Sequence, residues 1–242
     1  MFFSLSVRKL FLYTLLFIST IHAASASVIL IGTRIIYPSD KQTVDLKFRS
    51  SDNVPSVINI WINRKETSSG SDDAPFVVTP SIFRIDPNKG QSAKLMFTGG
   101  DLPGDRETLF FLNFVQLPAS SKNENKLLVS YKSTVKLFYR PTGLGYDSEK
   151  LDTYLKADLR NLSVGEISIT NNSPFYITPT KLQIAKNGKV ISLNQETELS
   201  MIKPFSSNVF RVKPYSNASD VALSISLIND LGGISTYKIT LK

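Results

Sequence analysis

Two basic side chains on one long predicted strand, Lys136 and Arg140, are the residues of this sequence best suited to binding chemistry. They are four positions apart, so they share one face of the strand and lie roughly 13 Å apart. A lysine in a cleft can hold a carboxylate through charge-assisted hydrogen bonds. Basic residues are common on exposed strands, so the argument depends on their position next to Pro141, at a predicted domain boundary. Clefts between domains are favoured binding sites, and we therefore expect a carboxylate-binding site here.

Catalysis by imidazole or thiol groups is excluded once an N-terminal export signal is removed. The single histidine, His22, lies in that predicted signal, and the chain has no cysteine. Ser-His-Asp and Cys-His catalysis, and zinc sites with His or Cys ligands, need residues that the exported chain lacks. Paired carboxylates could act without histidine, but Asp72-Asp73 is better interpreted as a solvated loop tip, and Asp105-Arg-Glu107 is too short to identify an active site. We expect no enzyme activity, no cofactor and no metal site.

The first 26 residues have the layout of a secretory signal peptide, which predicts export. Arg8 and Lys9 come before an apolar run, Leu10 to Ile18, and the small residues Ala23-Ala-Ser-Ala26 follow. The run is shorter than the ~20 residues that cross a bilayer as a helix, so we expect no stable membrane insertion. We predict cleavage after Ala26, with cleavage after Ala23 as the alternative.

The net charge is moderately basic and scattered along the chain. Removing Arg8 and Lys9 from the 28 basic residues leaves 26 against 20 acidic residues, a net charge of +6. The sequence has no arginine-rich block and no RNA-binding aromatic motif, so we expect no nucleic-acid partner. Without disulfides, the exported chain of about 216 residues depends on its apolar core alone, which is enough for one large or two ordinary domains.

Helical periodicity is almost absent, and short β-rich segments separated by turn residues predict an all-β protein. A break at Pro141-Thr-Gly-Leu-Gly145 divides these segments into two sets. We predict two immunoglobulin-like β-sandwich domains, residues 27–141 and 142–242, after the signal peptide 1–26. The predicted strands are Val28–Ile36, Thr43–Phe48, Val57–Asn63, Phe76–Thr79, Ala93–Phe97, Thr108–Leu117 and the long strand to Arg140, then Glu166–Thr170, Phe175–Thr178, Lys181–Ile184, Val190–Leu193, Val209–Val212, Val221–Leu227 and Ile234–Leu241.

The long strand, from Leu127 to Arg140, is more than twice the ~5–6 residues of an ordinary strand. Its odd positions are mostly apolar and its even positions mostly polar, as in a half-buried strand. Such a strand either belongs to two sheets or offers more apolar edge than its own domain covers. Elsewhere, Trp61 alternates with isoleucines and is interpreted as a core residue.

Several segments resemble the periplasmic chaperones of the chaperone–usher pathway, which assemble bacterial pili and fimbriae. They extend over nearly the whole exported chain in the order found in that family. The segments are Gly32-Thr-Arg34, Asp105-Arg-Glu-Thr-Leu-Phe-Phe-Leu-Asn-Phe114, Val135-Lys-Leu-Phe-Tyr-Arg-Pro141, Asn172-Ser-Pro174 with Pro179, and Ile228-Asn-Asp-Leu-Gly-Gly233.

The resemblance implies two immunoglobulin-like domains in a boomerang arrangement, with a basic cleft at the elbow. Arg34 and Lys136 correspond to the pair that anchors the C-terminal carboxylate of a pilus subunit. The interdomain ionic network of the family corresponds to Glu107, Arg140 and Asp230. The donor strand, which is lent to the subunit, corresponds to Leu127, Val129 and Tyr131.

The implied function is a periplasmic chaperone that binds, folds and caps pilus subunits by donor-strand complementation. It delivers them to an outer-membrane usher, so its expected partners are pilus subunits and the usher. The connection from Pro118 to Asn125 is short, as in members that build thick rod-like pili. Tyr131 departs from the family, which usually has an aliphatic residue there.

Two other functions are weighed against the chaperone. An extracellular adhesion or receptor module with two immunoglobulin-like domains would use the glycan-acceptor motifs that begin at Asn161, Asn171 and Asn217. It would not require Arg34, Lys136 and the donor face together. A secreted carboxylate hydrolase would need a constellation of acids, and only isolated acids are found.

Overall fold

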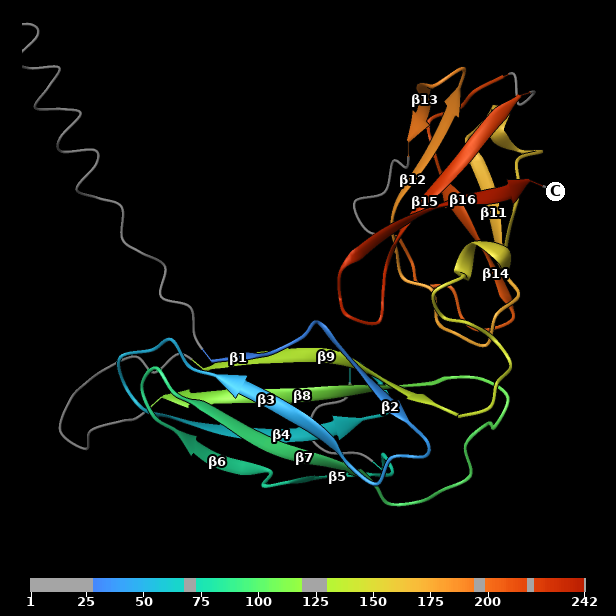
Figure 1. Cartoon of the computed structure of the whole chain (residues 1–242). Helices are drawn as coiled ribbons and strands as arrows, with labels where there is room; N and C mark the ends of the chain where they lie inside the picture. Colours follow the sequence, from blue (N-terminus) through green and yellow to red (C-terminus); the bar gives the residue numbers. More distant parts are fainter. Residues whose placement is uncertain (1–27, 68–72, 119–129, 194–198, 217–219, 242) are drawn as a thin grey trace, which may run out of the picture.

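The computed structural model describes residues 28–67, 73–118, 130–193, 199–216 and 220–241. Two all-β domains meet at an elbow (Figure 1), with the N-terminal domain across the lower part of the view and the C-terminal domain upright above one end of it. The expected fold class, two β-sandwich domains, is confirmed. Within the described ranges, no helix is long and apolar enough to cross a membrane.

The N-terminal domain is a sandwich of two sheets whose inner faces form one core. One sheet has the order β1-β3-β7-β5 and the other the order β2-β9-β8-β4-β6. Buried side chains such as Leu46, Ile58, Leu95 and Leu137, each at most 1% exposed, fill the space between them. The strands are β1 (Ile29–Leu30), β2 (Arg34–Pro38), β3 (Val44–Arg49), β4 (Ser56–Asn63), β5 (Phe76–Thr79), β6 (Ile82–Ile85), β7 (Gly90–Phe97), β8 (Thr108–Pro118) and β9 (Tyr131–Arg140).

The predicted first strand, Val28–Ile36, is two strands in different sheets. β1 pairs with β3 in one sheet, whereas β2 pairs with β9 in the other and runs parallel to it. The chain changes sheets at residues 31–33, where Gly32 has φ of 110°, a backbone conformation that side chains beyond glycine rarely adopt. This change of sheet places Arg34 beside Lys136 in the β2–β9 register.

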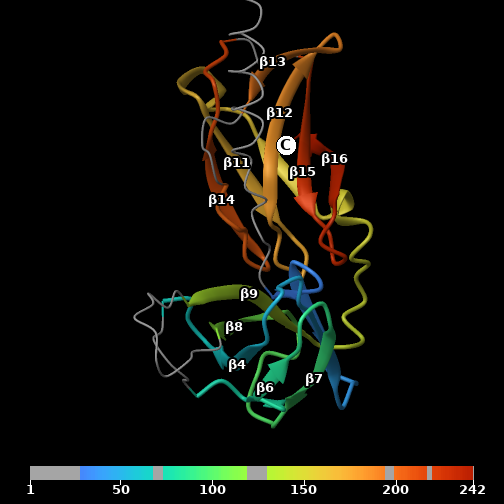
Figure 2. The ribbon, with the colours of Figure 1, turned by 90° about the vertical axis from the view of Figure 1, so that its left-hand side faces the viewer.

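The C-terminal domain has its strands in the order β13-β12-β15-β16-β10-β11-β14 around a second core. A short parallel pairing of β10 with β16 joins two antiparallel groups. Figure 2 shows β11 and β14 on one side of this domain and β15 and β16 on the other. The strands are β10 (Leu155–Asp158), β11 (Glu166–Asn171), β12 (Pro179–Lys186), β13 (Lys189–Leu193), β14 (Ser206–Arg211), β15 (Val221–Ile228) and β16 (Ile234–Leu241), with 3-10 turns η1 (Leu151–Thr153) and η2 (Leu162–Val164).

Three local predictions were wrong. The segment Phe175–Thr178 is not a strand; its ladder contact is a single bridge, Ile177 to Ile202, because the backbone N–H of Tyr176 turns away to a carboxylate of the other domain. Trp61 lies on the opposite face of β4 from the buried isoleucines and is half-buried, with the Lys132 ammonium 5.3 Å from the ring centroid. The short strands β6 and β10 were not predicted.

Candidate functional site

Arg34 and Lys136 lie side by side on the outer face of the N-terminal domain. Their strands, β2 and β9, are paired in parallel with these two residues in register, and adjacent strands are roughly 4.8 Å apart. Leu137 enters the core, so the even positions of β9, including Lys136, point away from it. Both cations are half-buried, and across the described ranges neither forms an ion pair.

The Arg34 guanidinium has a hydrogen-bonding group still to be satisfied. Its carbon lies 5.5 Å from the centroid of the Phe138 ring, and the buried Nε finds no hydrogen-bond partner among the described residues. Burial lowers the pKa of Arg34, while the nearby carboxylates of Asp230 and Glu107 act in the opposite direction. Arginine stays charged in proteins, so this is a half-buried cation with an unused donor. An added acceptor, such as a carboxylate, could pair with that donor.

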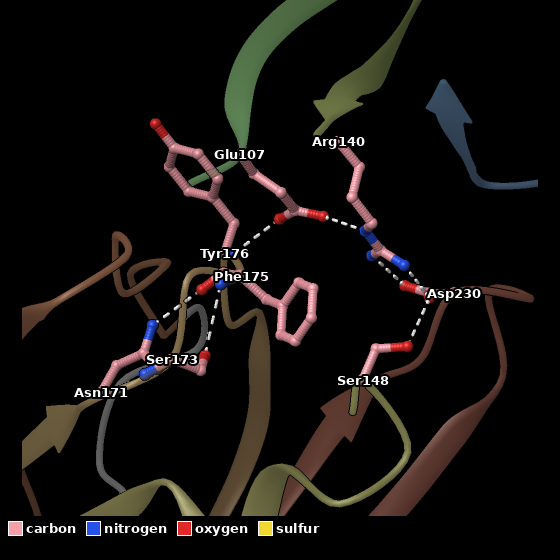
Figure 3. Close-up of polar contacts among 8 residues, drawn as sticks. All are labelled: Glu107, Arg140, Ser148, Asn171, Ser173, Phe175, Tyr176 and Asp230. Atoms are coloured by element: carbon pink, nitrogen blue, oxygen red, sulfur yellow. Dashed lines mark hydrogen bonds and ion pairs between the residues drawn. The ribbon is translucent and has the colours of Figure 1, made fainter. Parts of the chain in front are cut away.

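Arg140 connects the two domains through two carboxylates (Figure 3). Its Nε donates to Oε1 of Glu107 at 2.7 Å. Its Nη1 and Nη2 donate to Asp230 at 2.6 and 2.8 Å, in the bidentate arrangement typical of strong arginine–carboxylate pairs. The Ser148 hydroxyl also donates to Asp230, at 3.2 Å. The structure thus brings together Glu107, Arg140 and Asp230, the three residues predicted for the interdomain network.

Glu107 also receives a hydrogen bond from the C-terminal domain. The backbone N–H of Tyr176 donates to its Oε2 at 2.7 Å, and its own backbone N–H donates to the carbonyl of Pro174 at 2.9 Å. The Phe175 ring lies against the Arg140 guanidinium, 4.8 Å from centroid to carbon. The segment 174–176 therefore contacts both members of the Glu107–Arg140 pair, and this explains its departure from strand geometry.

A buried asparagine holds this segment in place (Figure 3). Asn171 is fully buried and its Nδ2 donates to the carbonyls of Phe175 at 2.7 Å and Lys203 at 3.0 Å. Its Oδ1 accepts from the backbone N–H and the hydroxyl of Ser173. With both amide hydrogens used and its side chain in the core, Asn171 is unsuited to carry a glycan. Sequence reasoning had assigned it only a possible acceptor motif.

Burial acts differently on the two carboxylates of the network. Glu107 is 3% exposed, and burial raises its pKa although Arg140 and the Tyr176 N–H oppose the shift. Burial also disfavours the charged form of Asp230, but hydrogen bonds and charge from Arg140 outweigh it and lower the pKa of Asp230. The Arg140 guanidinium is shared by two carboxylates: it forms two hydrogen bonds with Asp230, the less buried of the two, and one with Glu107.

A second contact between the domains was missed by sequence reasoning. The Arg106 guanidinium lies 5.1 Å from the centroid of Phe205, and the linker residue Tyr146 contacts the same ring at 6.2 Å. Phe205 has φ of 50°, which is uncommon for a bulky residue, and is 42% exposed. Asp105 orients Arg106 through two hydrogen bonds. Arg106 and Phe205 are far apart in the sequence and belong to no motif, so nothing in the sequence indicated this contact.

Of the predicted donor residues, Leu127 and Val129 lie outside the described residues. Tyr131 begins β9, is 61% exposed and is in register with Gln116 of β8. β9 pairs with β8 along its length but with β2 only from Lys136 onward. Within the part of the chain that the structure describes, Tyr131–Val135 therefore has a ladder partner on one edge alone, and that open edge ends at the two cations.

Comparisons with known proteins identify the family of this chain. Residues 27–145 match the family of pili and flagellar-assembly chaperones, PapD N-terminal domain, and residues 150–239 match the pili assembly chaperone PapD, C-terminal domain. The probable fimbrial chaperone YadV of Escherichia coli is 32% identical over 86% of this chain and 87% of its own length. The chaperone protein FimB/FhaD of Bordetella pertussis is 30% identical over 89% and 88%.

Solved structures show the same fold. The crystal structure of the YadV chaperone has a TM-score of 0.72 at 29% identity, covering 88% of this chain and 100% of that one. The SafB chaperone of Salmonella enterica, solved in complex with the SafA pilin, has a TM-score of 0.70 at 27% identity, covering 89% and 96%. This chain therefore belongs to the family of PapD-type pilus-assembly chaperones.

Proposed function

We propose that this protein is a periplasmic chaperone that binds, folds and caps pilus subunits and delivers them to an outer-membrane usher. The observation that carries the proposal is the open edge of Tyr131–Val135, which ends at the side-by-side cations Arg34 and Lys136. An open edge can add a strand to an incomplete sheet, and the cations can bind a chain-terminal carboxylate. The two features adjoin on one strand, so one extended client segment can use both.

The client in this mechanism is a sandwich that lacks one strand and exposes an apolar groove. Tyr131 and the preceding Leu127 and Val129 fill the groove while backbone hydrogen bonds complete the client's sheet. Each large apolar side chain that becomes buried contributes ~1.5–3 kcal/mol, and each backbone hydrogen bond ~0.5–1.5 kcal/mol. Burial and the ladder therefore dominate the affinity.

The cation pair has the separate task of setting register. A slip of one residue would turn every alternate side chain away from the groove. A carboxylate held between Arg34 and Lys136 fixes where the client chain ends and so prevents that slip. The unused Nε donor and the lack of a described ion-pair partner support this role for Arg34.

The Glu107–Arg140–Asp230 network has the task of holding the two domains at one angle. Its hydrogen bonds of 2.6 and 2.8 Å connect Arg140, at the end of β9 in the first domain, to Asp230 in the turn after β15 in the second. We assign residues 1–26 to a cleaved signal peptide, 27–141 to the first domain and 142–242 to the second. We assign the chain no catalytic role.

Co-expression with the pilus-subunit genes that neighbour its own gene tests the function. We expect periplasmic extracts to yield the tagged chaperone in a one-to-one complex with a subunit, identified by mass spectrometry, and the mature N-terminus to be Ser27. Recovery of the chaperone alone, with the subunits degraded or aggregated as they are without it, would reject the proposal.

A further inference from the structure

The turn between β15 and β16 touches the N-terminal domain at two of its residues. Asp230 is bound by Arg140 of β9, and Gly232, two residues later, lies against Thr33 in the connection between β1 and β2. Both ribbon views show this turn over that connection (Figures 1 and 2). The turn therefore joins the domains by one ionic contact and one steric contact.

Glycine at position 232 meets two separate requirements. Its φ of 83° is in the left-handed region, which glycine adopts without strain. In addition, a Cβ atom at this position would collide with the Thr33 hydroxyl oxygen. Gly188, in the turn between β12 and β13, has a similar φ of 75°, but a Cβ atom there would meet no atom within 4 Å. Among the glycines that the structure describes, Gly232 is the one whose Cβ would collide with the other domain.

The β15–β16 turn is held rigidly by its own hydrogen bonds. The Asn229 side chain accepts from the backbone N–H of Gly233 at 2.9 Å and donates to the Ser235 hydroxyl at 3.1 Å. The backbone N–H of Gly232 donates to the Asn229 carbonyl at 2.9 Å, and the Asn229 N–H donates to the Gly233 carbonyl at 2.8 Å. A turn closed in this way moves as a unit, so a force on Asp230 is carried to Gly232.

The ionic contact draws the domains together but does not by itself fix how closely they approach. An arginine side chain reaches its partner through several rotatable bonds, so Arg140 can follow Asp230 over a range of separations. Overlap between non-bonded atoms, in contrast, raises the energy steeply below the contact distance. The contact of Thr33 with Gly232 therefore supplies the limit that the ionic contact lacks.

The two contacts act at opposite ends of β2. Arg140 is in register with Pro38, the last residue of β2, whereas Thr33 directly precedes Arg34, the first residue. These ends are roughly 13 Å apart by strand rise. The attraction at one end can turn the C-terminal domain toward the first domain until the contact at the other end stops it.

We propose that Thr33 and Gly232 form a steric stop that sets the angle at which the Arg140–Asp230 pair closes the elbow. Both are positioning residues that act on the arrangement of the domains. A side chain at position 232 opens the elbow, and a smaller side chain at position 33 lets it close further. The inference extends the task proposed for the ionic network, the holding of one angle, and it concerns the free chaperone.

Distances between spin labels on the two domains test the proposal. The sequence contains no cysteine, so Lys47→Cys in β3 and Lys181→Cys in β12, at two exposed positions, give one label on each domain. Pulsed electron paramagnetic resonance then gives the distribution of label distances in the free chaperone. Gly188→Ala is the matched control, because it imposes a similar positive φ on alanine where the added Cβ meets nothing.

We expect Gly232→Ala to shift the mean distance by more than about 1 Å, the movement that relieves the overlap at the contact. Thr33→Ala should shift it in the opposite direction. Gly232→Ala/Thr33→Ala should return close to the wild type, because the hydroxyl is gone and the new Cβ would lie 3.4 Å from the Cβ of residue 33, an ordinary contact. Gly188→Ala should match the wild type.

The proposal is overturned if Gly232→Ala keeps the wild-type distance, if the double variant is displaced as far as Gly232→Ala, or if Gly188→Ala gives the same shift. Thr33→Ala tests the stop even if Gly232→Ala does not fold, since an unchanged distance in Thr33→Ala also contradicts it. These measurements use no subunit. Their failure leaves the proposed chaperone function standing, and failure of subunit capture leaves the stop standing.

Discussion

Replacing Arg140 by alanine tests how much the stability of the protein depends on neutralising the buried carboxylate of Glu107. Arg140 donates one hydrogen bond to Glu107 and two to Asp230. The side chain of Glu107 is 2% exposed and that of Asp230 is 37% exposed. Water can take over the hydrogen bonds of Asp230 after the substitution, but it reaches Glu107 poorly. Most of the cost should therefore come from Glu107.

We predict a loss of about 3–5 kcal/mol in the free energy of unfolding near neutral pH, the usual cost of removing one partner of a buried ion pair. The part due to Asp230 should be at most about 1 kcal/mol, as for exposed pairs. Adding Glu107→Gln to Arg140→Ala should recover most of the loss, because the uncompensated charge disappears and the Tyr176 N–H can still donate to the glutamine oxygen.

The pH dependence of the variant provides an independent check. Burial already raises the pKa of Glu107, and the loss of Arg140 should raise it further. A carboxyl group whose pKa is higher in the folded state than in the unfolded state binds its proton more tightly when folded, so the folded state gains stability as pH falls through the interval between the two values. Asp230 acts in the opposite sense in the wild type, since its lowered pKa stabilises the fold above its unfolded value and that contribution is lost on acidification. The deficit of Arg140→Ala relative to the wild type should therefore shrink as the pH is lowered from neutral toward the ordinary pKa of a glutamate.

Urea unfolding followed by fluorescence at several pH values measures all three variants, and small-angle scattering reports the angle between the domains. The reasoning is refuted if Arg140→Ala/Glu107→Gln is no more stable than Arg140→Ala, or if the deficit stays constant on acidification. Either result would mean that the buried charge of Glu107 is not the source of the cost.

Three further substitutions address other parts of the site. The double variant Arg34→Ala/Lys136→Ala should lose subunit capture in co-purification while its thermal midpoint stays within a few degrees of the wild type, since neither cation has a described ion-pair partner. Tyr131→Asp should weaken capture at least about tenfold without destabilising the fold, because the side chain is 61% exposed in the free chaperone. A double-mutant cycle of Arg106→Ala and Phe205→Asn in urea unfolding should give a coupling of about 0.5–1 kcal/mol, as expected for a partly exposed cation–π contact between the domains.

Controls separate these effects from general changes of charge or surface. Arg84→Ala/Lys94→Ala removes two cations from the N-terminal domain, on exposed side chains of β6 and β7, and should leave capture unchanged. Normal capture by Arg34→Ala/Lys136→Ala would disprove the carboxylate anchor. A large loss of stability in Tyr131→Asp would show that the start of β9 is internal, and a coupling near zero would remove the second contact between the domains.

The strands were predicted correctly where one face of the strand is covered by the core, because apolar and polar residues then alternate along the sequence. The isoleucines of β4 and Leu137 of β9 are buried as the period-two pattern predicted. The pattern did not reveal the division of Val28–Ile36, because both halves are rich in isoleucine and other strand-forming residues and only the sheet that each half joins distinguishes them. It also failed for Trp61, since an aromatic ring half-buried under Lys132 leaves the same sequence signal as one in the core.

The site was harder to predict from the sequence than the fold, because its contacts join distant parts of the chain. Glu107, Arg140 and Asp230 were named only through resemblance to a family, and nothing in their local sequence indicates that one guanidinium binds both acids. The segment around Tyr176 looked like a strand because its residues favour one; a single hydrogen bond to Glu107, 69 positions earlier, accounts for its different path. Such competition between local preference and a distant partner is visible only in three dimensions.

The position at which β2 begins decides how much of the β9 edge stays open. β2 covers one edge of β9 from Lys136 to Arg140 and does not reach Tyr131–Val135, because the preceding residues belong to the other sheet and the chain changes sheets at Gly32. Had Val28–Ile36 been one continuous strand beside β9, its first residues would have covered the edge of Tyr131–Val135. The left-handed backbone at Gly32 therefore has two consequences: the edge of Tyr131–Val135 stays open, and β2 begins with Arg34 in register with Lys136. The register of Arg34 with Lys136 and the start of the open edge are set by the same residue, so they cannot vary independently.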